Sequence, residues 1–244
     1  MTMLEIRKVS VRFGGLTAVD DVSLAVPEGT IMGIIGPNGA GKTTLFNVVA
    51  GILRPRTGSV LLGGEDITRL PAHRRARRGL ARTFQRLEVF GTLSVRENLL
   101  VAAESRRRWD RSTQPAFVAD ELCAELGLGE VAESLVDTLP TGTQRLVELG
   151  RALALRPRLL LLDEASSGLT ELETIQVGER LQRLAGQGLT VVLVEHDMPF
   201  VLSTCGRVAM LDHGVLVTEG TPDEVRNNPV VQEAYLGRNR EAAA

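Results

Sequence analysis

The chain has 244 residues, of which 43% are hydrophobic and 24% are charged, and its net charge is −2. These values are typical of a globular protein that buries a real core, and the slightly acidic balance argues against nucleic acid as the main partner. The two cysteines, Cys123 and Cys205, lie far apart in the sequence, which argues against a disulfide framework. No apolar run approaches the roughly 18 residues that cross a bilayer, so we expect any membrane role to come through a partner.

The first third of the chain combines short strands with a glycine-rich loop. Its apolar patterns predict three strands and then a helix: Leu4–Phe13, Val19–Val26, Ile31–Ile35 and Thr43–Ala50. Gly51 ends the helix, and Val60–Leu62 is a further short apolar run. Six arginines follow between Arg74 and Arg86. We interpret them as a solvated helix face, with contact to phospholipid or to an acidic partner as the alternative.

The middle third, from about residue 87 to 155, has the apolar spacing of helices. Ser94 and Glu97 predict a capping box at the start of one helix. A polar linker with the sequence RRRWDRSTQP precedes two further predicted helices, Phe117–Leu126 and Thr143–Leu155. This third of the chain therefore predicts a helical insert in the fold.

The last third again alternates strands with helices. In chain order it predicts a buried strand, a helix, a second buried strand, a helical segment and a hairpin: Leu159–Leu162, Leu172–Leu184, Val191–Val194, Phe200–Thr204, and Val208–Leu211 with Val215–Thr218. A short helix is expected to end the chain. Because strands alternate with helices on both sides of the insert, the fold class that we predict is α/β.

One loop carries the most specific motif. Gly36, Gly41, Lys42 and Thr43 fit the phosphate-loop pattern G-x-x-x-x-G-K-[ST], between a predicted strand and a predicted helix. Glycines let the backbone curl its N–H groups around phosphate oxygens, and the helix turns its positive end to the anion. We therefore expect these residues to bind a nucleotide: Gly36, Pro37, Asn38, Gly39, Ala40, Gly41, Lys42, Thr43 and Thr44.

The lysine in this loop is itself informative. Only two of the 28 lysine and arginine residues are lysines, Lys8 and Lys42. A compact ammonium can reach the β and γ phosphates through a narrow space, whereas a planar guanidinium is wider and its geometry is fixed. The hydroxyl of Thr43 is expected to reach Mg²⁺.

Polar side chains also follow two predicted buried strands. Asp163 and Glu164 end the run LLLLDE, and His196 follows VVLVE. The carboxyl edge of an open α/β sheet is where ligands bind, so these groups are expected beside the phosphate loop. There Asp163 would hold Mg²⁺, directly or through water, and Glu164 would act as general base or polarise the attacking water. His196 would donate a hydrogen bond to the γ phosphate. His73 and His213 lie on loop-like segments, and we expect no role for them.

These motifs, in this order, resemble the nucleotide-binding subunits of ABC transporters, and the resemblance covers nearly the whole chain. It implies an α/β fold with a phosphate-loop NTPase core of the ABC-ATPase type, which has a mixed sheet and antiparallel N-terminal strands, plus a helical subdomain. It further implies one domain over residues 1–244, with the core at 1–85 and 156–244, the helical subdomain at 86–155, and a C-terminal helical tail from about 220 to 244.

The same resemblance assigns further residues. Phe13 would stack on adenine, and Gln85, in the segment TFQ, would contact Mg²⁺ and water and sense the membrane partner. The segment Ser166–Thr170 would be a crossing loop that reaches a second subunit. The signature segment, which would face the nucleotide of that second subunit, consists of Leu139, Pro140, Thr141, Gly142 and Thr143.

The sequence departs from the family pattern at three places. The signature segment reads LPTGT where most members have LSGGQ, Thr170 stands where aspartate is usual, and Ala165 replaces a common proline. We expect the contact to the γ phosphate to be weakened rather than lost.

Several long stretches, among them ARTFQRLEVFGTLSVRENLLVA and EGTPDEVRNNPVVQEAYLG, resemble more narrowly the G-type subunit of branched-chain amino-acid importers. This implies an ATPase that needs ATP and Mg²⁺ and closes as a head-to-tail dimer with an identical or paralogous subunit. It would act peripherally on the cytoplasmic face of the membrane, with two permease subunits and, indirectly, a solute-binding protein. Leu87–Phe90 is our candidate for part of the permease dock, and a core segment is the alternative. Transport of urea or amides, export of lipid or lipopolysaccharide, and a soluble ATP-dependent machine are the competing functions.

Overall fold

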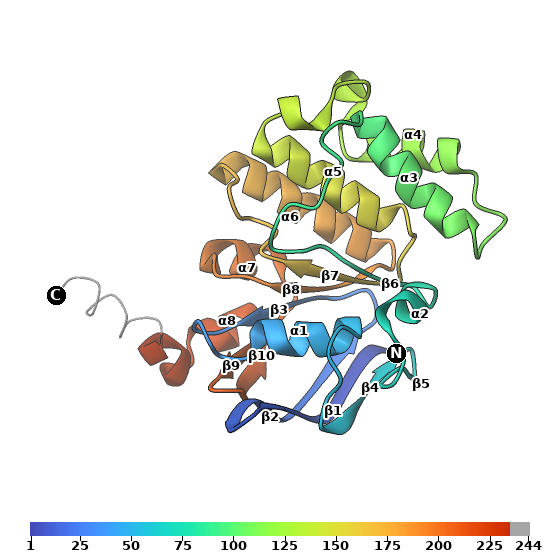
Figure 1. Cartoon of the computed structure of the whole chain (residues 1–244). Coiled ribbons are helices and arrows are strands. Elements are labelled where there is room, and N and C mark those ends of the chain that lie inside the picture. Colours follow the sequence, from blue (N-terminus) through green and yellow to red (C-terminus); the bar gives the residue numbers. More distant parts are fainter. Residues whose placement is uncertain (235–244) are drawn as a thin grey trace.

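Two β-sheets enclose one helix in the lower half of the molecule as drawn in Figure 1. The computed structural model describes residues 1–234. One sheet has four strands in the order β2-β1-β4-β5, with antiparallel neighbours, and the other has six in the order β10-β9-β3-β8-β7-β6. In the second sheet all neighbouring strands run parallel except the edge pair of β9 and β10.

The strands are β1 Thr2–Phe13, β2 Leu16–Pro27, β3 Ile31–Ile35, β4 Thr57–Leu62, β5 Glu65–Asp66, β6 Leu80–Arg82, β7 Leu159–Asp163, β8 Thr190–Val194, β9 Arg207–Asp212 and β10 Val215–Gly220. The α-helices are α1 Lys42–Ala50, α2 Ala72–Ala76, α3 Val95–Arg107, α4 Pro115–Glu125, α5 Thr141–Leu153, α6 Glu171–Gly186, α7 Met198–Thr204 and α8 Pro222–Arg226. Gly129–Val131 and Val136–Thr138 form short 3₁₀ helices.

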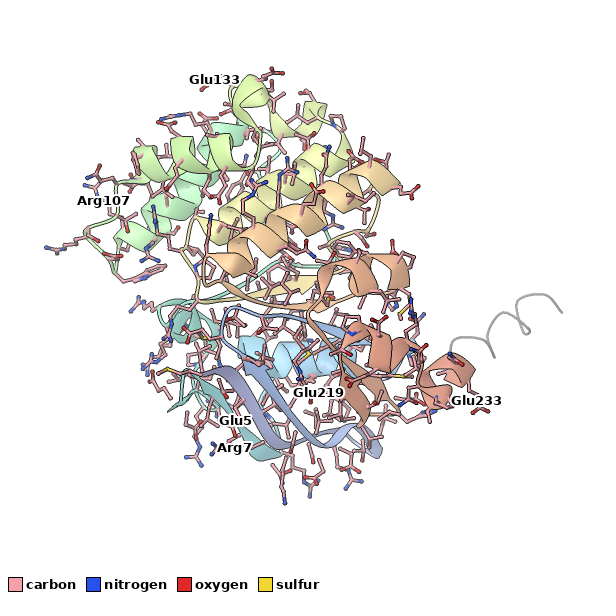
Figure 2. The ribbon with its side chains drawn as sticks, turned by 180° about the vertical axis from the view of Figure 1, so that it is seen from behind. Glu5, Arg7, Arg107, Glu133, Glu219 and Glu233 are labelled. Atoms are coloured by element: carbon pink, nitrogen blue, oxygen red, sulfur yellow. The ribbon has the colours of Figure 1, made fainter. Side chains whose placement is uncertain are left out.

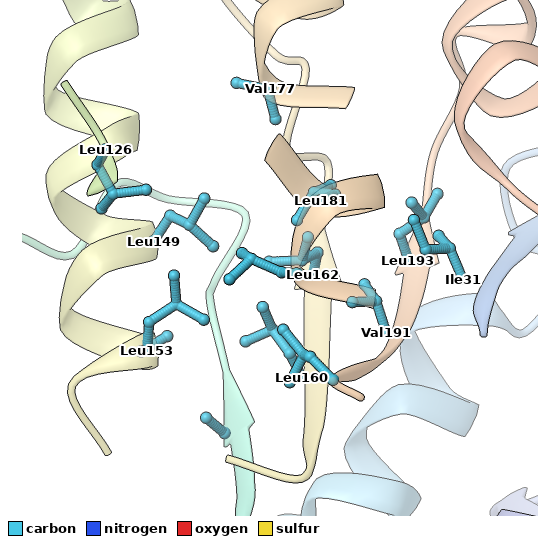
Figure 3. Close-up of a cluster of buried hydrophobic side chains, with 14 of the residues drawn as sticks. Ile31, Leu126, Leu149, Leu153, Leu160, Leu162, Val177, Leu181, Val191 and Leu193 are labelled. Carbon is cyan, nitrogen blue, oxygen red and sulfur yellow. The ribbon is translucent and has the colours of Figure 1, made fainter. Parts of the chain in front are cut away.

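Both faces of the central strands β3, β7 and β8 are buried, and apart from Asp163 and Thr190 at strand ends their side chains are apolar. Successive side chains of a strand point to opposite faces, so Leu160 and Leu162 of β7 join the cluster under the helices, which Figure 3 shows. Leu159 and Leu161 point the other way, into the cluster that packs around α1 between the sheets. The sheet therefore separates two hydrophobic clusters.

The predicted helical insert is present as α3, α4 and α5, and the Ser94–Glu97 capping box forms at the start of α3. Its apolar side chains share one cluster with α6 and with the upper face of the six-stranded sheet (Figure 3). The insert therefore has no core of its own, and this packing fixes it against the strands that end at the candidate site.

In the arginine-rich segment, where the sequence suggested a helix face, the structure has the short helix α2, which contains His73, a residue that we expected on a loop. The sequence pattern missed β6 in the same segment. β6 has only three residues, and its pairing with β7, not its own sequence, makes it a strand. Within the predicted C-terminal tail, α8 and residues 229–234 are helical, and residues 235–244 lie outside the described residues.

Charged side chains of both signs project from the surface, as Figure 2 shows for Glu5, Arg7 and Arg107. Not all arginines of the Arg74–Arg86 segment belong to that surface. Arg75 is 1% exposed, which corrects the expectation of a uniformly solvated face. Within residues 1–234, no helix combines the length and the apolar character needed to cross a membrane.

Arg75 closes the carboxyl end of α1. Its guanidinium donates to the carbonyls of Val48 and Val49, each at 2.7 Å, and to those of Leu70 and Thr68, each at 2.9 Å. Burial lowers the pKa of Arg75 to about 10, so the group stays charged at neutral pH. It therefore satisfies helix-end carbonyls that have no partner within the helix.

We expect Arg75→Met to destabilise the fold by about 3 kcal/mol, because it keeps most of the volume but leaves buried carbonyls without donors. Arg74→Met is the matched control, since Arg74 is exposed on the same helix. Urea unfolding curves of both variants measure the difference. Equal midpoints for the two variants would contradict this role of Arg75.

Candidate functional site

The predicted phosphate loop lies between β3 and α1 and packs tightly against two other segments. Gly36 has φ 144°, and a Cβ on it would lie 2.0 Å from the carbonyl oxygen of Leu211. Gly41 has φ 98°, and a Cβ there would lie 2.4 Å from the carbonyl oxygen of Ala18. Both positions therefore require glycine, for the backbone angle and for the space.

Lys42 is the first residue of α1 and folds back over the loop. Its side chain is largely buried, and Nζ donates to the carbonyls of Gly36 at 2.6 Å and Pro37 at 2.9 Å. No side chain caps α1 at Gly41, and no acidic residue lies in its first turn. The first N–H groups of an α-helix lack intrahelical acceptors, so this end of α1 suits an anion.

A cavity of about 1060 Å³ opens in front of this loop. Of the predicted site residues, it is lined by Phe13, Asn38, Gly39, Ala40, Gly41, Lys42, Thr43, Thr44, Gln85, Glu164 and His196. Phe13 ends β1, lines the cavity and is 52% exposed, so much of its surface is open to a ligand. The loop, the aromatic ring and the polar groups from three further segments thus meet at one cavity.

Glu164 links two of these segments. Gln85 Nε2 donates to Glu164 Oε2 at 3.1 Å, and His196 Nε2 lies 3.2 Å from Glu164 Oε1. The three residues that we predicted as catalytic therefore form one hydrogen-bonded group on the cavity wall. A carboxylate held at both oxygens has a defined direction, as a general base requires.

The sheet explains why these residues meet. β7 and β8 are parallel neighbours, with Asp163 opposite Val194, so the residues after both strands emerge at the same edge. Glu164 has φ 53°, in the left-handed region, and its N–H donates to the carbonyl of Val194 at 2.9 Å. This turn directs the side chain of Glu164 away from the strand and into the cavity.

Asp163 is placed differently from Glu164. It is 4% exposed and does not line the cavity. Its Oδ2 accepts a hydrogen bond from Arg82 at 2.9 Å, and Arg82 also donates to Asn47 Oδ1 of α1 at 2.6 Å. Sequence reasoning missed Arg82, which stands in a short strand among other arginines and has no motif of its own.

The signature segment and the crossing loop adjoin each other and not the cavity. None of the residues from Leu139 to Thr143 lines the cavity. A Cβ on Gly168 of the crossing loop would lie 3.3 Å from Thr141, and one on Gly142 would lie 2.0 Å from Glu173 Oε1. Within one chain the signature segment is therefore not part of the phosphate-loop site.

His213 was expected to have no role, yet it lines the cavity together with Leu16, Thr17 and Ala18. Its hairpin supports the phosphate loop, because Gly214 N donates to the carbonyl of Ala40 at 3.1 Å. No sequence pattern indicates this contact, since the two segments lie far apart in the chain and meet only through the packing of β2 on the β9–β10 hairpin.

The protein groups alone do not make a metal site. Among residues 1–234, no cluster of three or more His, Cys, Asp and Glu side chains is placed to hold a metal ion. Of the three predicted Mg²⁺ ligands, Thr43 and Gln85 line the cavity beside the phosphate loop, and Asp163 lies buried behind it. A few protein oxygens together with phosphates are what Mg²⁺ usually takes in such sites, so the donor set fits that ion when a nucleotide phosphate is present.

Comparison with known proteins identifies the same family as the sequence motifs. The model of the ABC transporter family matches residues 19–167, and that of the branched-chain amino acid ATP-binding cassette transporter matches residues 216–241. The chain is 39% identical to the high-affinity branched-chain amino acid transport ATP-binding protein BraF of Pseudomonas aeruginosa, over 96% of this chain and 98% of BraF. It is 36% identical to LivG of Escherichia coli, a protein of the same description, over the same shares of the two chains.

Two further similarities are relevant. The chain is 35% identical to LptB of Escherichia coli, the lipopolysaccharide export system ATP-binding protein, over 98% of this chain and 99% of LptB. A crystal structure of an ABC-transporter ATP-binding cassette in its ADP conformation matches with a TM-score of 0.87 at 28% identity, over 97% of this chain and 99% of that one. The fold predicted from the sequence is thereby confirmed.

Proposed function

We propose that this chain, which belongs to the ABC transporter family, is the ATP-hydrolysing subunit of an importer for branched-chain amino acids. The observation that carries the hydrolytic part is the group of Gln85, Glu164 and His196 on the wall of the phosphate-loop cavity. The identity to BraF and LivG, together with the C-terminal family match, supports the class of solute.

ATP would bind with its phosphates against the loop Gly36–Thr44 and its adenine on Phe13. The amide groups at the start of α1 and the ammonium of Lys42 would hold the β and γ phosphates. To do so, Lys42 Nζ exchanges at least one of its carbonyl acceptors, Gly36 or Pro37, for phosphate oxygens. The large exposed fraction of the Phe13 ring supports its role as a stacking platform.

Hydrolysis would begin with a water between Glu164 and the γ phosphate. Glu164 takes a proton from this water, while Gln85 and His196 keep the carboxylate directed at it. Mg²⁺ would be held by Thr43 and Gln85, and by Asp163 directly or through water, and it would neutralise charge that develops on the phosphates. Because Asp163 is buried behind the cavity wall and its Oδ2 is paired with Arg82, a bridging water is the contact that its position favours.

A second ATPase subunit would complete the site. The signature segment does not line the cavity of its own chain, and its residues Pro140 and Thr141 are exposed, so this end of α5 can face a partner that binds head-to-tail. The amide groups at the start of α5, beside the buried Gly142, would then approach the γ phosphate of the partner's nucleotide, with Pro140 contributing no hydroxyl. The dimer would close when ATP binds and reopen after the γ phosphate is lost, because both subunits contact that phosphate.

The permease would dock at a groove between β6, α3 and α5. Its volume is about 290 Å³, and its lining includes Phe84, Phe90 and Val101, which are 44%, 43% and 40% exposed. Exposed aromatic side chains in a concave patch are typical of binding sites. The groove lies where the core, residues 1–85 and 156–244, meets the helical part, residues 86–155, which is the division of the domain that we propose.

Transport by reconstituted vesicles tests this function. The full chain is reconstituted in vesicles with the permease subunits and the solute-binding protein of a branched-chain amino acid importer, and ATP is supplied on the side of the ATPase subunit. Labelled leucine, urea, acetamide and a glycolipid are then offered separately. We expect ATP-dependent uptake of leucine that is lost with Glu164→Gln. Uptake of urea or acetamide alone, or extraction of the glycolipid, would overturn the assignment of the solute in favour of the competing functions.

A further inference from the structure

One buried carboxylate beside the site has no part in the mechanism above. Glu195 directly follows β8 and is 2% exposed. An ionisable side chain so deeply buried is rare unless partners satisfy it. Burial raises the pKa of Glu195, and its hydrogen bonds oppose that rise.

Its partners come from the two loops that carry the site. Glu195 Oε1 accepts from the backbone N–H of Ser166 at 2.8 Å, and Oε2 accepts from the Ser166 hydroxyl at 2.9 Å. Oε2 also lies 3.2 Å from the backbone N–H of His196. Two of these three groups are N–H donors, which only an oxygen can satisfy, and they approach different oxygens of the carboxylate. An ionised carboxylate fits this pattern, and an amide does not.

We infer that Glu195 is a positioning residue, an inference that rests on the proposed function. Its carboxylate joins Ser166, at the start of the crossing loop, to the backbone of His196 by hydrogen bonds, and we call this arrangement the lock. Ser166 begins the crossing loop and lies two residues after Glu164, while His196 is the other neighbour of the Glu164 carboxylate. One carboxylate thus fixes both strand ends between which Glu164 is held. The lock holds Glu164 in position for hydrolysis and fixes the crossing loop that faces the second subunit. It makes no hydrogen bond to the phosphate loop.

Glu195→Gln tests the lock at constant volume. In this variant the backbone N–H of either Ser166 or His196 faces the amide NH₂ of the new side chain, which cannot accept a hydrogen bond. The two loops are then no longer joined through one side chain. We expect the kcat of ATP hydrolysis to fall roughly tenfold, the size typical for losing a hydrogen bond to a charged group. The affinity for a fluorescent ATP analogue should stay within about twofold, because no contact of the phosphate loop changes. Glu179→Gln, on the exposed face of α6, removes the same charge and should change neither value.

Ser166→Ala removes the hydroxyl that donates to Glu195, and it tests the same hydrogen bonds if Glu195→Gln folds poorly. It removes one of the three hydrogen bonds, so we expect about a threefold loss of kcat, and the double variant should be no slower than Glu195→Gln alone. Wild-type kcat in Glu195→Gln, equal losses of kcat and ATP affinity, or fully additive effects in the double variant would each overturn the inference. A wild-type chain that binds no ATP would instead overturn the proposed function.

Discussion

Glu164→Gln is expected to bind ATP as the wild-type chain does and to hydrolyse it at least about 100-fold more slowly. The amide can still accept a hydrogen bond from Gln85 Nε2 and can pair with His196 Nε2, so the geometry at the cavity is kept. It cannot take a proton from water, so the general base is lost. Because the γ phosphate then stays in place, the ATP-bound dimer should accumulate.

Phosphate release, binding of a fluorescent ATP analogue and light scattering measure the three consequences. Glu179→Gln serves as the control here too, since it removes a carboxylate from the surface of α6. Hydrolysis at the wild-type rate in Glu164→Gln would refute the assignment of the base. Loss of ATP binding together with turnover would show that the carboxylate supports the pocket rather than the reaction.

Lys42→Ala should weaken ATP binding by roughly 100-fold, because a charged hydrogen-bond donor to the phosphates is removed from a buried position. Lys42→Arg should lose almost as much, since the wider guanidinium has to fit where Nζ now lies 2.6 Å from the Gly36 carbonyl. This second variant tests why the chain uses lysine here and arginine nearly everywhere else.

Lys8→Ala is the matched control, because Lys8 is the only other lysine and is exposed on β1. Titration with a fluorescent ATP analogue gives the affinities, and circular dichroism verifies that each variant is folded. Wild-type affinity in Lys42→Ala would show that the loop holds phosphate through its backbone alone. Wild-type affinity in Lys42→Arg would refute the argument from the shape of the ammonium.

The sequence by itself determined the parts of this protein that depend on local chemistry. Gly36 and Gly41 stand where the backbone angles and the space require glycine, and Lys42 stands where the compact ammonium of lysine fits. The residues after β7 and β8 meet because neighbouring parallel strands end at one edge of the sheet. The sequence pattern alone therefore predicts that Glu164 and His196 lie beside the phosphate loop.

Only the tertiary structure decided which partners these residues have. The pairing of Arg82 with Asp163, the burial of Arg75, the approach of His213 to the cavity and the lock at Glu195 all join segments distant in sequence. Hydrophobic periodicity reports which face of a segment is buried and not what lies opposite it. Because the free energy of a buried charge depends on that opposite group, a single sequence does not reveal these contacts.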